Sequence, residues 1–551
     1  MLALELVGFF IVAFLIRIVG SHWGLANALH NQTFHPDEEV NWRYAQFIDP
    51  ARFHFTPGFY NYGTLYLTLL RIASDMTSAY TGRMHGNADW AFISRAIYAG
   101  RILSILSGCW LVLIGWFSGL RIGNKWTGRA TATVLMVSPG LVVHSRFATV
   151  DILAAALAAA SGYYALKLVT ITEPERNFAI RWAIYGGIFA GLSAGTKYSG
   201  ILAVLMIGTA LFVSERRQFV KGSVLAVVSS LVVFILVTPG VILDSHKFVS
   251  DLAFEVSHEE SGHGLVFVGT SPAFIYQLGN LVVGMGLLIV TIGLIYLFLS
   301  GWKRKKWAWV LLAFFLPTYF LIGKSQVKFY RYSIPLSFPI ALSFAMYSTD
   351  LFANQRYKRL AIPIVAISLV GLDGGALIST IRFTSWMIGP DPRDEAAGYI
   401  KSISTSRTTV GVVEDPWFWT PPIYPNTGLV RMVPFEIRNQ FRILAKDPSV
   451  VQYIPSNPNH RIAWDDRLIN DDHPDFVTYS DFESLSLQRI SNEMKDGAHF
   501  DPGIEKQVRA YRTFMSALTK NYVLDATYGP HLKIVEDLRY VAPTVYLWKR
   551  K

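Results

Sequence analysis

Long apolar runs, separated by short polar connections, dominate the first 380 residues of this 551-residue chain. A bilayer has no water to pair with backbone N–H and C=O groups, so an apolar run that enters it must form a helix. Crossing the hydrocarbon core takes about 20 residues. The runs therefore predict a polytopic α-helical membrane protein with roughly 11 spans, possibly 10–13. The runs are Leu2–Val19, Ile102–Leu120, Ala130–Val143, Ile152–Leu168, Trp182–Ala194, Gly200–Val213, Val224–Leu243, Phe274–Leu299, Trp307–Ile322, Ile334–Met346 and Leu360–Ile378.

The overall composition supports a membrane location. Apolar residues make up 52% of the chain and charged residues 16%, and the mean hydropathy is +0.33. A soluble core could not cover that much apolar surface, whereas lipid can. The formal net charge of +11 could suggest nucleic acid, but the basic residues stand in short blocks between apolar runs, so we expect no nucleic-acid partner. The single cysteine, Cys109, cannot form an intramolecular disulfide.

Basic residues mark one side of the predicted membrane domain. If the N-terminus is cytoplasmic, the basic connections all fall on the cytoplasmic side, as the positive-inside bias requires. We therefore expect a multi-pass plasma-membrane protein whose segments 21–95, 244–273 and 381–551 are extracytoplasmic. The connections carry Arg121, Lys125 and Arg129; Arg176 and Arg181; Arg216, Arg217 and Lys221; Lys303, Arg304, Lys305 and Lys306; and Arg356, Lys358 and Arg359.

The composition changes near residue 380. We predict a transmembrane catalytic domain over 1–380 and a soluble extracytoplasmic α/β domain over 381–551. Periodicity predicts helices and strands in the second domain and an interfacial helix in the first outer loop. The predicted elements are helices at Asp394–Ser402 and Glu505–Leu518, strands at Thr409–Val413, Phe476–Tyr479 and Thr544–Trp548, and the interfacial helix at Tyr62–Ile72.

Carboxylates stand at two places on the predicted outer side. Asp37 and Glu38 follow His35 and Pro36 directly behind the first span, and Asp151 begins a later apolar run. An acidic run is often only a solvated loop, and an acid at a helix start can simply be favoured by the helix dipole. A carboxylate held rigidly at the mouth of a bundle can also act as a general base. We interpret Asp37, Glu38 and Asp151 as catalytic candidates that converge across the bundle.

Cations stand on the same outer side, where the positive-inside bias should deplete them. Lys197 lies between two short apolar runs, and Lys328 and Arg331 precede another span. Snorkelling explains one or two such residues. A cluster calls for an anionic partner, such as a lipid phosphate that is either a substrate or a bystander headgroup.

The segment between Asp244 and Gly264 adds His258 and Glu259. Their spacing matches no firm zinc motif, so we predict no metal site and interpret the segment as contacts to an acceptor. A divalent metal remains the less favoured alternative.

The motifs together resemble the GT-C superfamily of integral membrane glycosyltransferases, in the group of prokaryotic members similar to protein mannosyltransferases and aminoarabinose transferases. The resemblance rests on His35–Glu39 (HPDEE), Arg146–Asp151 (RFATVD), Thr196–Tyr198 (TKY) and Arg331–Pro335 (RYSIP). It implies a catalytic Asp37 with Glu38 beside it and Asp151 as second acid, and a carrier phosphate held by cations. The residues that we assign to the donor phosphate are Lys197, Lys328, Arg331 and Tyr332, and those that we assign to acceptor or sugar contacts are His35, Arg146, His258 and Glu259.

The predicted function is inverting transfer of a sugar from a polyprenyl-phosphate donor to an acceptor hydroxyl, with no required cofactor. The acceptor could be lipid, glycan or protein. Three alternatives stay open: an oligosaccharide transferase that uses a lipid pyrophosphate, a transporter for an anionic solute, and an inactive scaffold. A transporter predicts internal repeats and charges at mid-membrane, whereas these charges stand at the outer ends of runs. An aromatic segment at 415–422 (DPWFWTPP) could stack on sugar rings or pack against the bundle.

Overall fold

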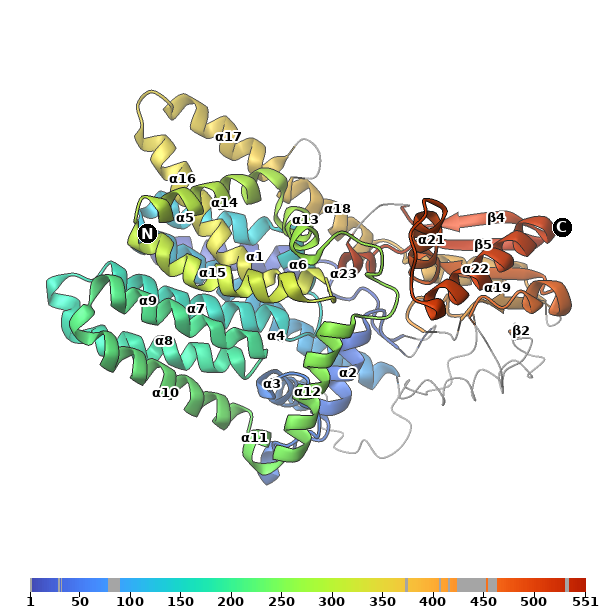
Figure 1. Cartoon of the computed structure of the whole chain (residues 1–551), viewed down its shortest axis with the longest axis horizontal. Coiled ribbons are helices and arrows are strands. Elements are labelled where there is room, and N and C mark those ends of the chain that lie inside the picture. The colour runs from blue at the N-terminus through green and yellow to red at the C-terminus, as the bar shows by residue number, and fades with distance from the viewer. Residues whose placement is uncertain are drawn as a thin grey trace.

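The computed structural model describes residues 2–27, 30, 32–77, 90–371, 375–405, 408–414, 417–423, 452–453, 463–530 and 535–551. Figure 1 shows a bundle of helices with an α/β domain at one end. The bundle helices are α1 (Leu2–Ile18), α4 (Trp90–Ile122), α5 (Lys125–Val137), α6 (Pro139–His144), α7 (Asp151–Val169), α8 (Ala179–Ala194), α9 (Val204–Ser214), α10 (Phe219–Val237), α11 (Gly240–Leu243), α13 (Ala273–Met285), α14 (Leu287–Trp302), α15 (Lys306–Lys324), α16 (Ser337–Ala353), α17 (Lys358–Val370) and α18 (Ala376–Ile388).

In the part of the chain that the structure describes, the apolar runs lie largely in helices, which confirms the helical membrane fold. Within the described residues, five helical segments are long and apolar enough to cross a membrane: Trp90–Ile122, Asp151–Val169, Arg216–Val237, Lys306–Lys324 and Ile334–Ala353. The bent pair α13 and α14 would make a sixth. Several other runs form helices of 17 residues or fewer, so the count of roughly 11 spans stays a prediction.

The run Phe274–Leu299 is not one straight helix. It breaks at Gly286, where the helix axis bends by 119° between α13 and α14. Gly286 has a φ of +98°, a backbone conformation that glycine adopts without the steric cost other residues incur. The break brings the C-terminal part of α13 beside α6 and the turn that carries Arg331.

Helix α7 lies at the centre of the bundle. Its alanines from Ala154 to Ala160 are buried, and their small side chains let α4, α8 and α9 approach closely, as in other membrane bundles. The N-terminus of α7, at Asp151, points toward the end of the bundle that carries the outer segments.

The outer segments form three helices at the end of the bundle that faces the α/β domain (Figure 1): α2 (Pro36–Ala45), α3 (Leu65–Thr77) and α12 (Ser245–Ser261). Helix α3 corresponds to the interfacial helix predicted at Tyr62–Ile72. Residues 78–89 of the first outer segment lie outside the described residues. The N-terminus and the connection between α9 and α10 lie at the opposite end of the bundle, which agrees with the predicted separation of basic and catalytic sides.

Among its described residues, the C-terminal region contains a five-stranded mixed sheet in the order β2-β1-β3-β5-β4. Strand β1 pairs in parallel with β2 and β3, and β5 pairs antiparallel with β3 and β4. The predicted helices and strands are all present, while the domain boundary at 380/381 stays a prediction. The elements are α19 (Pro392–Ile403), β1 (Thr409–Val412), β2 (Gln452–Tyr453), β3 (Phe476–Ser480), α21 (Asp481–Lys495), α22 (Pro502–Asn521), β4 (Tyr522–Tyr528), α23 (Glu536–Arg539) and β5 (Val545–Arg550).

One aromatic cluster joins this domain to the bundle. Tyr540 and Phe418 from the C-terminal region pack in the same cluster as Trp23, Phe34 and Phe147 from the first outer segment and the start of α7. Of the aromatic segment predicted at 415–422, Asp415 and Pro416 lie outside the described residues, and Trp417 to Trp419 pack in or against this cluster. The cluster places α23 directly over the end of the bundle where Asp151 lies.

Candidate active site

Asp37 lies in the first turn of α2. Pro36 starts the helix, a position where the missing N–H of proline costs nothing, and His35 before it is extended. The positive end of the helix favours a carboxylate at this place. The Asp37 side chain is 24% exposed, and its Oδ2 lies 2.8 Å from Nη1 of Arg331.

Asp151 is the first residue of α7 and is almost fully buried, with its side chain 3% exposed. Its Oδ1 accepts a 2.7 Å hydrogen bond from Nζ of Lys197, which stands in the turn after α8. The same ammonium lies 4.4 Å from the centre of the Tyr332 ring, within reach of a cation–π interaction. A buried carboxylate needs such a partner, because an unpaired charge is costly to bury.

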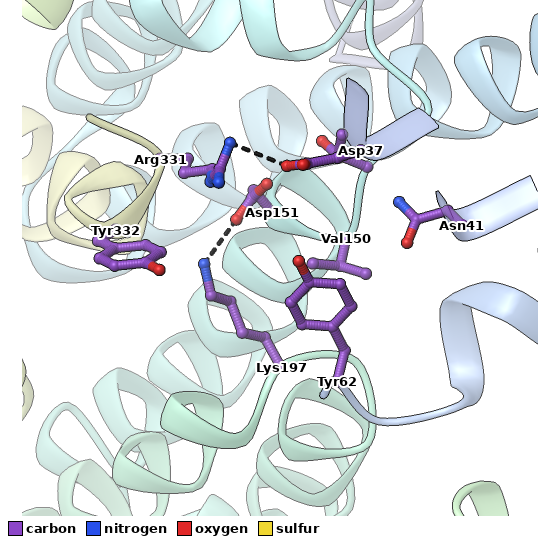
Figure 2. Close-up of a pocket in the computed structure, with 9 residues that line it drawn as sticks. Asp37, Asn41, Tyr62, Val150, Asp151, Lys197, Arg331 and Tyr332 are labelled. Carbon is purple, nitrogen blue, oxygen red and sulfur yellow. Dashed lines mark hydrogen bonds and ion pairs between the residues drawn. The ribbon is translucent and has the colours of Figure 1, made fainter. Parts of the chain in front are cut away.

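The two ion pairs meet in one cavity of about 240 Å³, including the open space at its mouth. Figure 2 shows Arg331 reaching Asp37 and Lys197 reaching Asp151, with the Tyr332 and Tyr62 rings on either side of Lys197. The two acids and the two cations thus converge as the sequence predicts. The cavity is lined by Asp37, Asn41, Tyr62, Thr149, Val150, Asp151, Lys197, Arg331 and Tyr332.

This arrangement has a defined chemical capacity. Two cations on adjacent walls can hold an anion with several oxygens, and guanidinium and ammonium groups both suit phosphate. A carboxylate beside them can accept a proton from a hydroxyl group. Within the described residues, no group of three or more His, Cys, Asp or Glu side chains is arranged to hold a metal ion.

The chain is similar to known proteins in part of its sequence and in its fold. A family model described as dolichyl-phosphate-mannose-protein mannosyltransferase matches residues 65–250, less than half of the chain. No curated protein sequence matches the chain.

Solved structures match over much more of its length. ArnT from Cupriavidus metallidurans bound to undecaprenyl phosphate has a TM-score of 0.50 at 14% identity, over 99% of this chain and 97% of that one. AglB from Archaeoglobus fulgidus, in complex with an inhibitory peptide and a dolichol-phosphate, has a TM-score of 0.52 at 10% identity, over 99% of this chain and 88% of that one. The chain has the GT-C fold. The match to the apo form of the Archaeoglobus fulgidus oligosaccharyltransferase has a TM-score of 0.50 at 12% identity, and covers 74% of this chain and 62% of the longer one.

The GT-C resemblance predicted from the sequence is therefore confirmed, but several assigned residues lie outside the cavity. Glu38 points away from Asp37 and into the protein. Both of its oxygens accept hydrogen bonds from Arg101 at 2.7 Å, and one also accepts the Ala148 N–H at 2.8 Å. Neither side chain of this pair is exposed. Glu38 thus holds α2 against α4 and the segment before α7, and it does not line the cavity.

Arg146 and Lys328 are likewise used elsewhere. The Arg146 guanidinium donates to the carbonyl oxygens of Ile16 and Arg17 and to Thr384, so it ties α1 to α18. The Lys328 ammonium donates to Thr270 and to the carbonyl oxygen of Ser271, each at 3.0 Å. Neither residue lines the cavity. Both side chains have protein groups as their hydrogen-bond partners.

His35 lies behind the cavity. Its ring packs against Phe147 and Tyr540 at centroid distances of 4.3 and 4.8 Å. Burial, reinforced by the nearby Arg331 and His144, holds the pKa of His35 well below its usual value, so the imidazole is neutral. A neutral ring in an aromatic stack supports the start of α2, and His35 is not among the residues that line the cavity.

His258 and Glu259 lie on α12, outside the residues that line the cavity. Glu259 accepts a hydrogen bond from the Ser325 hydroxyl, and its carbonyl oxygen accepts the Gln326 N–H at 2.8 Å. His258 Nε2 lies 3.3 Å from His263 Nδ1. These contacts hold α12 against the segment that precedes Arg331.

The sequence interpretation missed several cavity residues. Asn41 stands one helical turn after Asp37, so the i,i+4 rule could have found it. Thr149 stands two residues before Asp151. Tyr62 had no signal beyond its place in an aromatic segment. Asp537 of α23, whose carboxylate lies against the turn of Arg331, had no signal either.

Proposed function

We propose that the protein is an inverting glycosyltransferase that moves a sugar from a polyprenyl-phosphate donor to an acceptor hydroxyl on the outer face of the plasma membrane. The observation that carries this proposal is the shared cavity, in which two carboxylates each face a cation: Asp37 with Arg331 and Asp151 with Lys197. The GT-C fold supports a lipid-phosphate donor, as do the ligands in two of the matching structures, undecaprenyl phosphate in ArnT and a dolichol-phosphate in AglB.

The cations have the donor phosphate as their proposed partner. A phosphate that enters between Arg331 and Lys197 competes with Asp37 and Asp151 for the same N–H groups. Bidentate guanidinium contacts and the Lys197 charge then offset the charge that grows on the leaving phosphate. The Tyr332 ring contacts the Lys197 ammonium and holds it in position.

Asp37 is the proposed base. Its carboxylate accepts the proton of the acceptor hydroxyl while that oxygen forms a bond to the anomeric carbon. The bond from this carbon to the phosphate oxygen breaks on the opposite face, and the polyprenyl phosphate leaves with the electron pair. Asp151, buried deeper, orients a sugar or acceptor hydroxyl through its second oxygen. This reaction needs no cofactor, and transfer measured with a chelator tests that.

The remaining assigned residues have supporting roles in this proposal. Glu38 and His35 hold the start of α2, and Lys328, His258 and Glu259 hold the segment before Arg331. Arg146 joins α1 to α18. The α/β domain and the cavity lie on the extracytoplasmic side, with the N-terminus and the basic connections in the cytoplasm.

The test is transfer by the purified chain in detergent with a panel of polyprenyl-phosphate sugars and mixed lipid, glycan and peptide acceptors. Mass analysis should find released carrier phosphate and a product of opposite anomeric configuration. Asp37→Asn should lower transfer about 10²–10⁴-fold while undecaprenyl phosphate still binds. Full transfer by Asp37→Asn would refute the base, and a product of retained configuration would refute direct displacement.

An oligosaccharide transferase that uses a lipid pyrophosphate is the second candidate, because the fold also matches AglB. A pyrophosphate carries more charge than a monophosphate link, so this candidate predicts preference for pyrophosphate donors and loss of activity with a chelator. Equal activity with and without chelator, on monophosphate donors alone, excludes it.

A further inference from the structure

Helix α23 of the C-terminal region reaches the turn that carries Arg331. The Asp537 side chain is fully buried, and each of its oxygens accepts one backbone N–H: Oδ1 from Tyr330 at 3.2 Å and Oδ2 from Arg331 at 2.9 Å. These partners are more than 200 residues apart in the sequence.

The Asp537 carboxylate supplies hydrogen-bond acceptors that the turn itself lacks. Residues 330–332 form a single 3-10 turn, and the first N–H groups of any helical turn have no partner within it. Phe329, which precedes the turn, gives no side-chain cap. A carboxylate at this place satisfies two N–H groups at once and also faces the positive end of the turn.

The surroundings of Asp537 exclude water and fix its direction. His144 Nε2 lies 3.8 Å from Oδ2. The Tyr330 ring is confined between Gly140 of α6 and Gly284 of α13, where an added Cβ would lie 2.0–2.2 Å from the nearest ring atom. Packing therefore fixes the Tyr330 side chain. The Asp537 carboxylate holds the backbone of the same turn, from which the Arg331 side chain extends toward Asp37.

We propose that Asp537 is a positioning residue, which caps the Tyr330–Tyr332 turn and so makes the C-terminal region part of the phosphate-binding wall. The identity of the anion that Arg331 binds rests on the proposed function, whereas the ordering of the turn by Asp537 does not. The C-terminal region thus acts in donor binding. Loss of the cap should weaken undecaprenyl phosphate binding by about tenfold or more, through a misplaced Arg331.

The matched control is the preceding residue on the same helix. Glu536 is also buried, but its carboxylate pairs with Arg539 at 3.2 Å. The variants Asp537→Asn, Asp537→Ala and Glu536→Gln are compared in the full chain, together with Arg331→Ala and the Asp537→Ala/Arg331→Ala double variant. Asp537→Asn keeps the shape and one acceptor oxygen, so it is expected to fold even where alanine does not.

Two readouts decide the proposal. Hydrogen exchange of a peptide that contains Tyr330 and Arg331 should speed up about tenfold or more in Asp537→Ala, less in Asp537→Asn, and not in Glu536→Gln. Binding of undecaprenyl phosphate in detergent micelles should weaken in Asp537→Ala but fall no further in the double variant than in Arg331→Ala, because one residue acts through the other.

Unchanged exchange in the Asp537 variants overturns the cap, and additive losses of binding in the double variant overturn its action through Arg331. Equal effects of Glu536→Gln and Asp537→Asn would mean general loosening of α23, which also overturns it. If the unmodified chain neither binds undecaprenyl phosphate nor transfers any sugar, the proposed function fails, and the exchange comparison alone still decides the cap.

Discussion

Replacing Glu38 with glutamine removes one charge from an ion pair that is wholly excluded from solvent. Arg101 donates from Nε and Nη2 to the two Glu38 oxygens at 2.7 Å, and its Nη1 donates to the carbonyl oxygens of Ser21 and Trp23. Glutamine presents an NH₂ group where one of these oxygens stood, so it opposes a guanidinium N–H. An unpaired charge then stays buried between α2 and α4, and breaking such a pair costs about 3–5 kcal/mol.

The assay is unfolding of the purified chain by a denaturing detergent in mixed micelles, with transfer activity measured on the same samples. Glu38→Gln should lose about 3–5 kcal/mol of unfolding free energy. Removing both charges in Glu38→Met/Arg101→Met should recover part of that loss, because no uncompensated charge stays behind. The adjacent Asp37→Asn is the matched control: its side chain is 24% exposed, so its stability should change by only about 1 kcal/mol while transfer falls about 10²–10⁴-fold.

The opposite result would refute this reasoning. A Glu38→Gln variant that is as stable as the unmodified chain but inactive would return Glu38 to the reaction centre, as the sequence alone predicted. A double variant less stable than Glu38→Gln would also contradict the argument, because the charge would then not be the source of the loss.

Other substitutions test the support of the site and its junction. Gly284→Ala places a Cβ about 2 Å from the Tyr330 ring and should cost about 1–3 kcal/mol, whereas Gly279→Ala on the same helix meets open space and should be neutral or slightly stabilising in the same unfolding assay. Burial raises the pKa of Asp481 to about 6, so its neutral form stabilises the fold at low pH and that stabilisation is lost as the pH rises through about 6. Asp481→Asn should therefore gain up to about 3 kcal/mol at pH 7.5 and little at pH 4.5, and equal gains at both values would contradict the burial argument. The buried Arg393 guanidinium donates to Asp391 and to the carbonyl oxygens of Phe418 and Tyr540, and Arg393→Lys removes this set of donors. Limited proteolysis should therefore release the C-terminal region faster in Arg393→Lys than in the control Arg382→Lys, whose side chain is exposed.

The sequence predicted the helices well because apolar length is a local signal. Its limits appear where geometry depends on distant partners. The break at Gly286 is hidden in a run that is apolar on both sides, and only its positive φ reveals that the chain turns there. Three strands of the C-terminal sheet, β1, β3 and β5, were predicted, but β2, β4 and the strand order were not, since pairing joins strands far apart in the chain.

The charged residues show the same difference between local signals and distant contacts. Asp37, Asp151, Lys197 and Arg331 were found because acids and cations on one outer side are unusual and must be paired. Asp37 and Glu38 could not be told apart, because adjacent helical residues point about 100° from each other and only the position of Arg101 decides which one faces inward. Asp537 carried no local signal at all.

Charge conservation within the cavity explains why the two acids and two cations belong together in the proposed reaction. Asp37, Asp151, Lys197 and Arg331 sum to zero, and a phosphodiester-linked donor adds one negative charge. When Asp37 accepts the acceptor proton it becomes neutral, and the leaving phosphate gains the same charge, so the total does not change. Arg331 loses its carboxylate partner at the moment when a second charge appears on the phosphate. The guanidinium can therefore pass from one anion to the other over a short distance, which requires its backbone turn to be held still, and Asp537 is the group placed to hold it.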